Sequence, residues 1–263
     1  MKKPFITLLP VFYLCTSFQA TFVKPVSPVT SVYMSKSTPS SMRKRPVIVW
    51  QPSHQTNTGV NFSEAAVCNG IVEAAMNTKP GMKEYKVWSL GEKGLHHADV
   101  GSNTIIEQTS AVTNGQLSGY AWELKKANKR DPQVFISVHN NGGTKSHAVW
   151  GFIHEGDKYE MENRKLAERL VKAISAATGL KDRGVLFDSS TGRNDYKCNA
   201  TGKLAFYSLD ENVNTAPYRV LLEVGDNGVS KEFLEDPKNQ KKLGEAIKGA
   251  LVTWIAEKDW NRL

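Results

Sequence analysis

The stretch VFISVHNNGG, residues 134–143, decides how this chain is expected to fold. It is a short apolar run, rich in β-branched residues, that ends in a histidine and a polar turn with two glycines. Such a run is typical of a buried strand. In an open parallel sheet the loops at the carboxyl ends of the strands line the ligand crevice, so His139 is expected at its edge.

Two other apolar runs end in the same way. VIVW at residues 47–50 leads through a short polar turn to His54, and VLL at residues 220–222 leads directly to Glu223. A polar residue at one strand end is more commonly just hydrogen-bonded than part of a site. Three such ends, which carry two histidines and a carboxylate, favour a shared functional site at one edge of the sheet.

The net charge of +8 comes from the amino-terminal part of the chain. Residues 1–45 carry seven lysines and arginines and no acidic residue, which leaves about +1 for residues 46–263. This nearly neutral remainder argues against a basic nucleic-acid-binding face, whereas the basic tail allows loose attraction to an anionic surface such as a cell envelope. Three cysteines are too few for a disulfide scaffold, and the pattern does not indicate a bond between Cys68 and Cys198.

Residues 1–20 have the form of a secretory signal. Two lysines precede an apolar core that is too short to span a membrane stably. Cleavage is expected near Ala20; Cys15 raises the alternative of a lipoprotein, which the bulky Leu14 before it disfavours. Residues 21–46 are rich in Ser, Thr, Pro and Lys and are predicted to form a disordered linker or an extended spacer. A secreted protein, periplasmic or extracellular and at the cell wall, is therefore expected.

Strands alternate with helices over residues 47–263. The predicted strands are 47–50, 85–90, 134–139, 148–153 and 220–224, and the predicted helices are 64–79, 117–129, 160–178 and 239–257. Ser63 is expected to cap the first of these helices, and Gly179 is expected to end the helix at 160–178. This alternation predicts one α/β domain with a mainly parallel sheet and helices on both faces.

The polar strand ends suggest a metal centre. A catalytic zinc site needs three protein ligands from His, Glu or Asp, and one open position for water. His54 and His139 supply two ligands, and Glu64, ten residues after His54, supplies the third if the loop between them folds back. Glu223 then remains as a general base beside a water whose pKa the zinc lowers.

Simpler alternatives exist for these residues. A carboxylate in the first turn of a helix, such as Glu64, also favours the positive end of the helix dipole. Glu73 is a weaker rival ligand farther along the same helix. The other histidines are expected at the surface or in loops: His96, His97, His147 and His154. The sequence has no Gly-x-Ser-x-Gly motif, and neither Cys68 nor Cys198 has a catalytic context, so nucleophilic catalysis is poorly supported.

These residues resemble those of the zinc-dependent N-acetylmuramoyl-L-alanine amidases of bacterial cell-wall turnover. FISVHNN at 135–141 resembles the family's strand with its second zinc histidine, and LEVG at 222–225 resembles its catalytic-glutamate segment. Three further segments are similar: KAN at 126–128, LAERL at 166–170 and GLKDRGV at 179–185. The resemblance implies a phosphorylase/hydrolase-like domain in which His54, Glu64 and His139 bind Zn²⁺ and Glu223 is the base.

Two flanks depart from the family. The usual Asp-Pro-Gly-His-Gly-Gly at the first histidine is here QPSHQT, residues 51–56, and the phenylalanine common after the glutamate segment is here Asp226. These changes bear on the substrate cleft rather than on the four functional positions. Residues 91–116 and 187–217 resemble insertions that could shape or cover that cleft.

The sequence therefore predicts a secreted zinc hydrolase that cuts the amide between N-acetylmuramic acid and L-alanine of peptidoglycan, in cell-wall turnover or remodelling. Two alternatives stay open: a zinc peptidase or carboxypeptidase acting on cell-wall peptides, and a wall-binding protein with a degenerate site, which the altered flank of His54 suggests. Peptidoglycan is the expected partner, and the need for a protein activator is left open. Neither nucleic acid nor a stable membrane span is expected.

Overall fold

The computed structural model describes residues 45–260, apart from residues 57, 80, 92–111, 114, 115, 118, 192–195, 199 and 259. The predicted signal and almost all of the predicted spacer lie outside the described residues, as do His96 and His97. All described residues belong to one compact unit. Within them, no helix combines the length and the apolar character that crossing a membrane requires.

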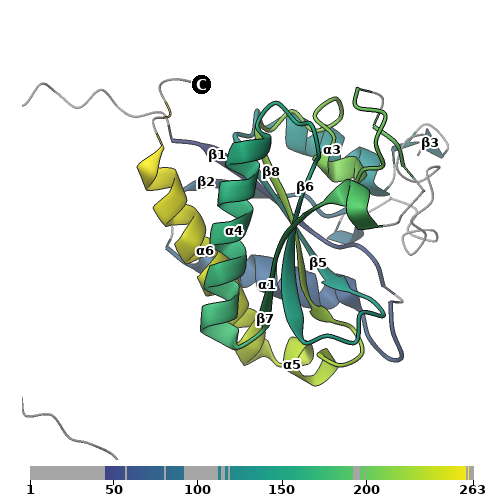
Figure 1. Cartoon of the computed structure of the whole chain (residues 1–263), viewed down its shortest axis with the longest axis vertical. Helices are drawn as coiled ribbons and strands as arrows, with labels where there is room; N and C mark the ends of the chain where they lie inside the picture. Colours follow the sequence, from purple (N-terminus) through teal and green to yellow (C-terminus); the bar gives the residue numbers. More distant parts are fainter. Residues whose placement is uncertain are drawn as a thin grey trace, which may run out of the picture. The chain divides into compact units, whose positions relative to one another are not determined.

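A six-stranded sheet lies at the centre of this unit (Figure 1). In sheet order the strands are β2 (Lys83–Lys86), β1 (Val47–Pro52), β5 (Val134–Asn141), β8 (Tyr218–Asp226), β6 (Ala148–Ile153) and β7 (Lys181–Phe187). Four neighbouring pairs are parallel, and β6 runs antiparallel to β8. The sheet is therefore mixed, and the carboxyl ends of β1, β5 and β8 meet at one edge. A separate antiparallel pair is formed by β3 (Val112–Thr113) and β4 (Gln116–Leu117).

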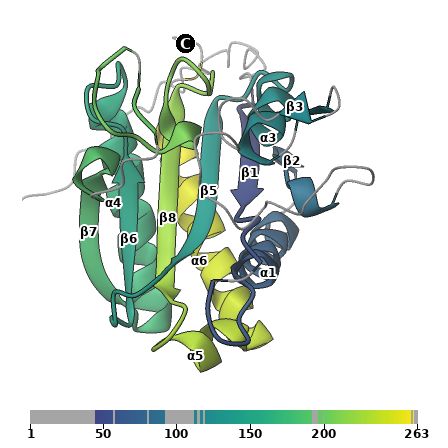
Figure 2. The same ribbon diagram turned by 90° about the vertical axis from the view of Figure 1, so that its right-hand side faces the viewer.

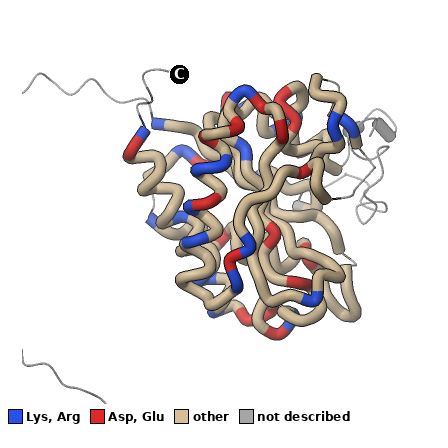
Figure 3. The backbone as a smooth tube through the Cα atoms, in the orientation of Figure 1, with Lys and Arg blue, Asp and Glu red and all other residues tan. Residues whose placement is uncertain are grey.

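Helices lie on both faces of the sheet (Figure 2). They are α1 (Glu64–Asn77), α3 (Gly119–Asn128), α4 (Glu160–Thr178), α5 (Lys231–Glu235) and α6 (Pro237–Glu257). The α1, α4 and α6 helices pack on one face, and α3 packs on the other. Basic and acidic residues are interspersed along α4 and α6 (Figure 3), which agrees with the nearly neutral charge of this part of the chain.

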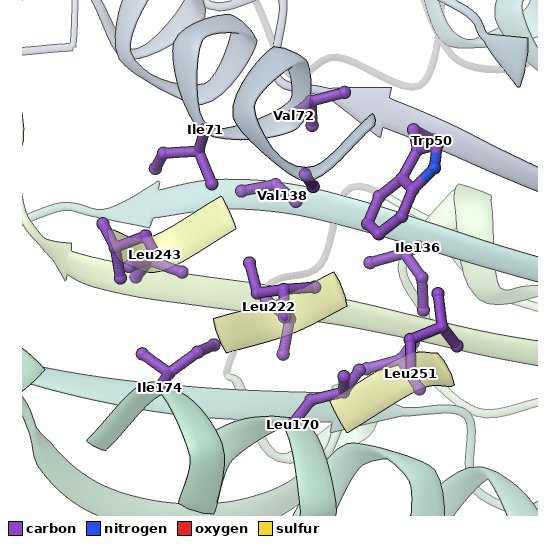
Figure 4. Packing of buried hydrophobic residues seen from close by; sticks show 14 of the residues in the cluster. Trp50, Ile71, Val72, Ile136, Val138, Leu170, Ile174, Leu222, Leu243 and Leu251 are labelled. Atoms are coloured by element: carbon purple, nitrogen blue, oxygen red, sulfur yellow. The ribbon is translucent and has the colours of Figure 1, made fainter. Parts of the chain in front are cut away.

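The main hydrophobic core lies between the sheet and α1, α4 and α6 (Figure 4). Five of its members come from five different elements: Ile71, Ile136, Leu170, Leu222 and Leu251. The alternate strand residues, such as Phe135, pack with Leu124 of α3 on the opposite face. Because side chains alternate along a strand, His139 and Glu223 also belong to the face that α3 covers.

The helix boundaries confirm the predicted capping residues. The Ser63 side chain accepts a hydrogen bond from the backbone N–H of Ala66 at the start of α1. Gly179 ends α4 in the left-handed conformation, with φ 80°, and its N–H donates to the carbonyl of Ser175. A residue without a side chain adopts this conformation without steric strain, so the sequence signal and the structure agree.

Two strands differ from the prediction. The strand expected at 85–90 is β2, Lys83–Lys86. The Val87 N–H still donates to the carbonyl of Trp50 in β1, and the chain then leaves the sheet. The Trp88 indole N–H donates to the carbonyl of Ser53 at 3.0 Å, and Ser89 continues into a 3₁₀ turn. The unpredicted strand β7 is a half-exposed edge strand that pairs only with β6, so it lacks the apolar run that marks a buried strand.

His154 lies in the loop after β6, one of the two predicted places, but it is not at the surface. It is 1% exposed, and its Nδ1 lies 3.0 Å from a carboxylate oxygen of the equally buried Asp188. Burial lowers the pKa of His154, but the hydrogen bond and charge of Asp188 outweigh it and raise the pKa to about 9. His154 therefore forms a buried ion pair at neutral pH, a long-range partnership that its local sequence does not reveal.

This pair predicts a pH-dependent contribution to stability. The folded-state pKa of His154 is raised, so the stabilisation is complete below the unfolded-state pKa near 6.5 and is lost as the pH rises through about 9. We expect the difference in free energy of unfolding between wild type and Asp188→Asn to shrink by roughly 2 kcal/mol over that range. Urea unfolding of both proteins at pH 6, 7.5 and 9.5 measures it, and a difference that stays constant would contradict the ion pair.

A glycine lets α1 and α6 pack closely. A Cβ atom added at Gly244 would lie 2.6 Å from the backbone nitrogen of Ala75 and 2.6 Å from the carbonyl oxygen of Ile71. We expect Gly244→Ala to lower the free energy of unfolding by about 1–3 kcal/mol, because the helices must separate. Gly249→Ala is the matched control on the same helix, since a Cβ there meets nothing within 4 Å. The control should be neutral or stabilising in thermal unfolding, and equal effects of both variants would refute the close-packing argument.

Candidate active site

Three of the predicted site residues lie where three strands end. His54 follows β1 by two residues, His139 lies near the end of β5, and Glu223 lies near the end of β8. His139 and Glu223 are direct partners in the parallel register of β5 and β8. On the other side of β8, Glu223 is the register partner of Trp150 in β6. A histidine, a carboxylate and an indole thus form one row across the sheet.

Glu64, the fourth predicted site residue, is brought to His139. The loop after His54 folds back as predicted, because the backbone N–H of Ala65 donates to the carbonyl of Gln55 at 2.8 Å. Glu64 begins α1, and its carboxylate lies 3.0 Å from Nδ1 of His139. Both side chains are buried. Glu64 is therefore more than a charge at a helix end, because it contacts a second predicted site residue.

The other ring nitrogen of His139 is notable. Its Nε2 is buried and has no hydrogen-bond partner among the residues that the structure describes. A buried polar atom without a partner is destabilising, so such atoms concentrate where a ligand or ion completes them. His139 therefore presents a nitrogen that is suited to bind a ligand or ion that the described residues do not supply.

His54 is held by a residue that the sequence analysis did not select. Its Nδ1 lies 3.0 Å from a carboxylate oxygen of Glu123 on α3, and both side chains are buried. The Tyr120 ring, one helical turn earlier, lies 4.1 Å from the His54 ring and 6.3 Å from the His139 ring, between centroids. Tyr120 therefore joins the two histidines to one cluster.

A sequence signal for Glu123 exists. The buried side of α3 carries Tyr120, Leu124 and Ala127, which recur at helical spacing, and Glu123 falls on the same side. An acidic residue on the apolar side of an amphipathic helix needs a partner inside the protein. The sequence alone does not say which partner, because His54 is 69 residues away.

The cysteine beside the site is not a nucleophile. Burial raises the pKa of the Cys68 thiol well above its ordinary value, and the charges of Glu64 and Glu223 raise it further. The thiol donates a hydrogen bond to the side-chain oxygen of Asn140. Both Cys68 and Cys198 are free cysteines, so no disulfide joins them.

A groove of about 700 Å³ opens beside this cluster. Glu64, His139 and Glu223 all contribute to its lining. One part of the lining is polar: Asn140, Asn141, Thr144 and Asn227. Another part is apolar: Trp150, Phe152, Leu186 and Phe206. Leu186 and Phe206 belong to or adjoin the region 187–217, so residues from this predicted insertion do reach the groove.

The departure at Asp226 has a structural explanation. Its carboxylate accepts hydrogen bonds from the backbone N–H groups of Thr144 and Lys145 on one side, and of Gly228 and Val229 on the other. Burial raises the pKa of Asp226. A hydrogen bond from the Thr144 hydroxyl and the backbone bonds just named outweigh it and hold the pKa below its ordinary value. Asp226 therefore ties the loop after β5 to the turn after β8, at the rim of the groove.

The side chains of His54, Glu64 and His139 are of the kinds that bind metals, but they are not grouped around one point. Two histidines and a carboxylate form a donor set that zinc accepts, and the partnerless Nε2 of His139 fits a metal ligand. In the part of the chain that the structure describes, no three His, Cys, Asp or Glu side chains are grouped closely enough to hold an ion. The predicted ligands instead occur in two pairs, Glu64 with His139 and His54 with Glu123.

Comparison with known protein families gives a match over more than half of the chain. The model of the N-acetylmuramoyl-L-alanine amidase family matches residues 97–253. This range includes Glu123, His139 and Glu223, but it begins after His54 and Glu64. The family match therefore does not reach the two amino-terminal residues of the predicted zinc site, which stay a prediction.

Individual proteins of the same kind are also similar. An uncharacterized cell wall amidase of Bacillus anthracis is 29% identical over 147 residues, which cover 53% of this chain and 24% of that protein. This chain thus spans about a quarter of the length of that relative.

Two solved structures share the fold. The catalytic domain of CwlV, an N-acetylmuramoyl-L-alanine amidase from Bacillus (Paenibacillus) polymyxa var. colistinus, is 19% identical with a TM-score of 0.55, and covers 81% of this chain and 99% of its own. The CwlD amidase from Clostridioides difficile, solved with the GerS lipoprotein, is 16% identical with a TM-score of 0.55, and covers 81% and 100%. At these identities the likeness establishes the fold.

Proposed function

Because the chain belongs to the N-acetylmuramoyl-L-alanine amidase family, we propose that it hydrolyses the amide between N-acetylmuramic acid and L-alanine in peptidoglycan. One observation carries the proposal: His139 and Glu223 are register partners on adjacent strands, and both line the same groove. A nitrogen ligand and a carboxylate base placed side by side in a groove are what amide hydrolysis with an activated water needs.

Zinc is the metal that the proposal assigns to this site, with His54, Glu64 and His139 as its ligands. Bound there, Zn²⁺ would polarise the scissile carbonyl and lower the pKa of a coordinated water. The donor types support this assignment, and the partnerless Nε2 supports His139 in particular. Glu64 contacts Nδ1 of the same ring, so its carboxylate would have to turn from Nδ1 to reach an ion on Nε2. The pairing of His54 with Glu123 supports the assignment further, because metal-binding histidines commonly pair their other nitrogen with a carboxylate.

The remaining residues are assigned to substrate and proton handling. Glu223 would accept the proton of the attacking water and return it to the departing amine of L-alanine. The side-chain amide of Asn141 offers hydrogen bonds to a peptide stem, whereas Trp150 offers an apolar surface to a sugar ring. Peptidoglycan combines these two chemistries in one substrate.

Export belongs to the same proposal. Residues 1–20 have the form of a signal, and the substrate lies in the cell envelope, so a periplasmic or extracellular location at the wall follows. The CwlD neighbour was solved with a lipoprotein. A requirement for an activating protein would therefore be tested by adding envelope extract to an inactive preparation.

Product analysis tests the reaction. The full chain, loaded with zinc, is incubated with purified peptidoglycan, and the soluble products are identified by mass spectrometry. The proposal predicts stem peptides with a free L-alanine amino group and glycan strands with a free lactyl carboxyl group. Released terminal amino acids would instead identify a peptidase. Stoichiometric binding to the wall without turnover would identify a wall-binding protein.

A further inference from the structure

A buried carboxylate controls the orientation of His54. Glu123 is completely buried, and three groups from different parts of the chain surround it. The backbone N–H of Ser89 donates to one carboxylate oxygen at 2.8 Å, and Nδ1 of His54 lies 3.0 Å from that same oxygen. The side-chain amide of Gln51 donates to the other oxygen at 2.6 Å. The carboxyl group thus has partners on both oxygens, as a buried polar group requires.

This arrangement decides which nitrogen of His54 carries the hydrogen. Both oxygens of Glu123 accept hydrogen bonds from N–H donors, the Ser89 backbone and the Gln51 amide, so Nδ1 of His54 is assigned as the donor in its contact with Glu123. A neutral imidazole has a single N–H, and Nε2 is then left with a lone pair. The Nε2 atom is therefore the one that can serve as a metal ligand.

The altered flank of His54 fits the same network. Gln51 stands where the resembling family usually has aspartate, and its amide lies against Glu123. An aspartate there would set a second buried carboxylate beside the first, which is strongly unfavourable without a cation between them. The Gln51 carbonyl oxygen in turn accepts a hydrogen bond from the hydroxyl of Ser137 on β5. The change at residue 51 and the acid at residue 123 therefore suit each other.

We propose that Glu123 is a positioning residue that fixes His54 as the Nδ1–H tautomer and thereby presents its Nε2 lone pair to the metal. The part that concerns the metal rests on the function proposed above. The control of Glu123 over the His54 tautomer does not, because the contacts that establish it lie within the chain.

The tautomer is measured directly in the metal-free full-length protein by ¹⁵N NMR of its histidine rings, with His54 assigned by its loss in His54→Gln. The wild type should show His54 with hydrogen on Nδ1 at a pH where the ring is neutral. Glu123→Leu removes the acceptor of the Nδ1 hydrogen; glutamine would not, because Ser89 and His54 contact the same carboxylate oxygen and an amide oxygen there would keep both bonds. The leucine variant should shift His54 toward the Nε2–H form. Hydrogen on Nε2 of His54 in the wild type would overturn the proposal, whether or not the variant folds.

Zinc affinity is the second measurement, made by competition with a chelator. Glu123→Leu should bind zinc about 10- to 100-fold more weakly than wild type, the range typical of losing such a partner. Glu123→Asp, which keeps the charge, should recover part of this loss. Asp188→Asn is the matched control, because it removes the charge from another buried carboxylate–histidine pair. It should lower thermal stability without changing the His54 tautomer or the zinc affinity.

The outcomes separate this inference from the proposed function. Equal zinc affinities of wild type and Glu123→Leu would overturn the role of Glu123 in metal binding. A wild type that shows the Nδ1–H tautomer but binds no zinc would refute the proposed metal function, while the control of His54 by Glu123 would stand confirmed.

Discussion

Glutamine in place of Glu223 is expected to slow peptidoglycan hydrolysis by roughly a hundred- to ten-thousandfold, the range that general-base catalysis contributes. Glutamine has nearly the same shape as glutamate but cannot take a proton from water. Glu223 is the strand partner of His139, and both line the groove, so the substitution acts at the point where the substrate would be attacked. The initial rate of stem-peptide release, with zinc content measured on the same sample, provides the comparison with wild type.

Glu73→Gln is the matched control for this variant. It makes the same chemical change on the exposed surface of α1, where Glu73 pairs with Lys86 rather than with a site residue. Its turnover should stay close to that of wild type. Wild-type turnover in Glu223→Gln would remove Glu223 from the mechanism, and loss of zinc in that variant would make Glu223 a metal ligand instead.

Replacing His139 by alanine is expected to abolish both zinc binding and hydrolysis. The substitution removes the buried Nε2 that has no partner in the described part of the chain, and it leaves Glu64 without its Nδ1 contact. We expect a loss of zinc affinity of at least about a hundredfold, the upper end of what removal of a supporting residue causes. Elemental analysis of the full chain after zinc loading and buffer exchange should find about one zinc in wild type and none in the variant.

His147→Ala controls for the general loss of an imidazole. His147 is hydrogen-bonded to the Ser230 hydroxyl at 2.9 Å and packs edge-on against Phe233, so it has structural partners of its own. This variant should keep one zinc per chain. A His139→Ala protein that also keeps one zinc would exclude His139 as a ligand.

The parts of the structure that follow from local patterns could be predicted from the sequence. The buried strand before His139 and the helix between Ser63 and Pro80 show in apolar runs and in a capping residue, because burial and hydrogen-bonding demands act on neighbouring residues. The alternation of strands and helices places strand ends together, so the sequence could also predict that His139 and Glu223 lie close to each other.

The parts that depend on distant partners could not be predicted. Glu123 and His54 are 69 residues apart, and Asp188 and His154 are 34 residues apart, so neither pair leaves a spacing signal. The sequence also left two roles open for Glu64, a charge at a helix end or a site residue, and only the fold shows its carboxylate against His139. The sequence did not predict the edge strand β7, because a half-exposed strand needs no apolar run.

The central claim is that this groove hydrolyses the N-acetylmuramoyl-L-alanine amide with the help of zinc. The most direct test measures newly exposed L-alanine amino groups when the full chain acts on purified peptidoglycan, before and after treatment with a chelator and again after zinc is restored. The account predicts release that stops with the chelator and returns with zinc. Release that continues unchanged in the chelator would contradict the proposed metal site, and no release with zinc bound would contradict the proposed reaction.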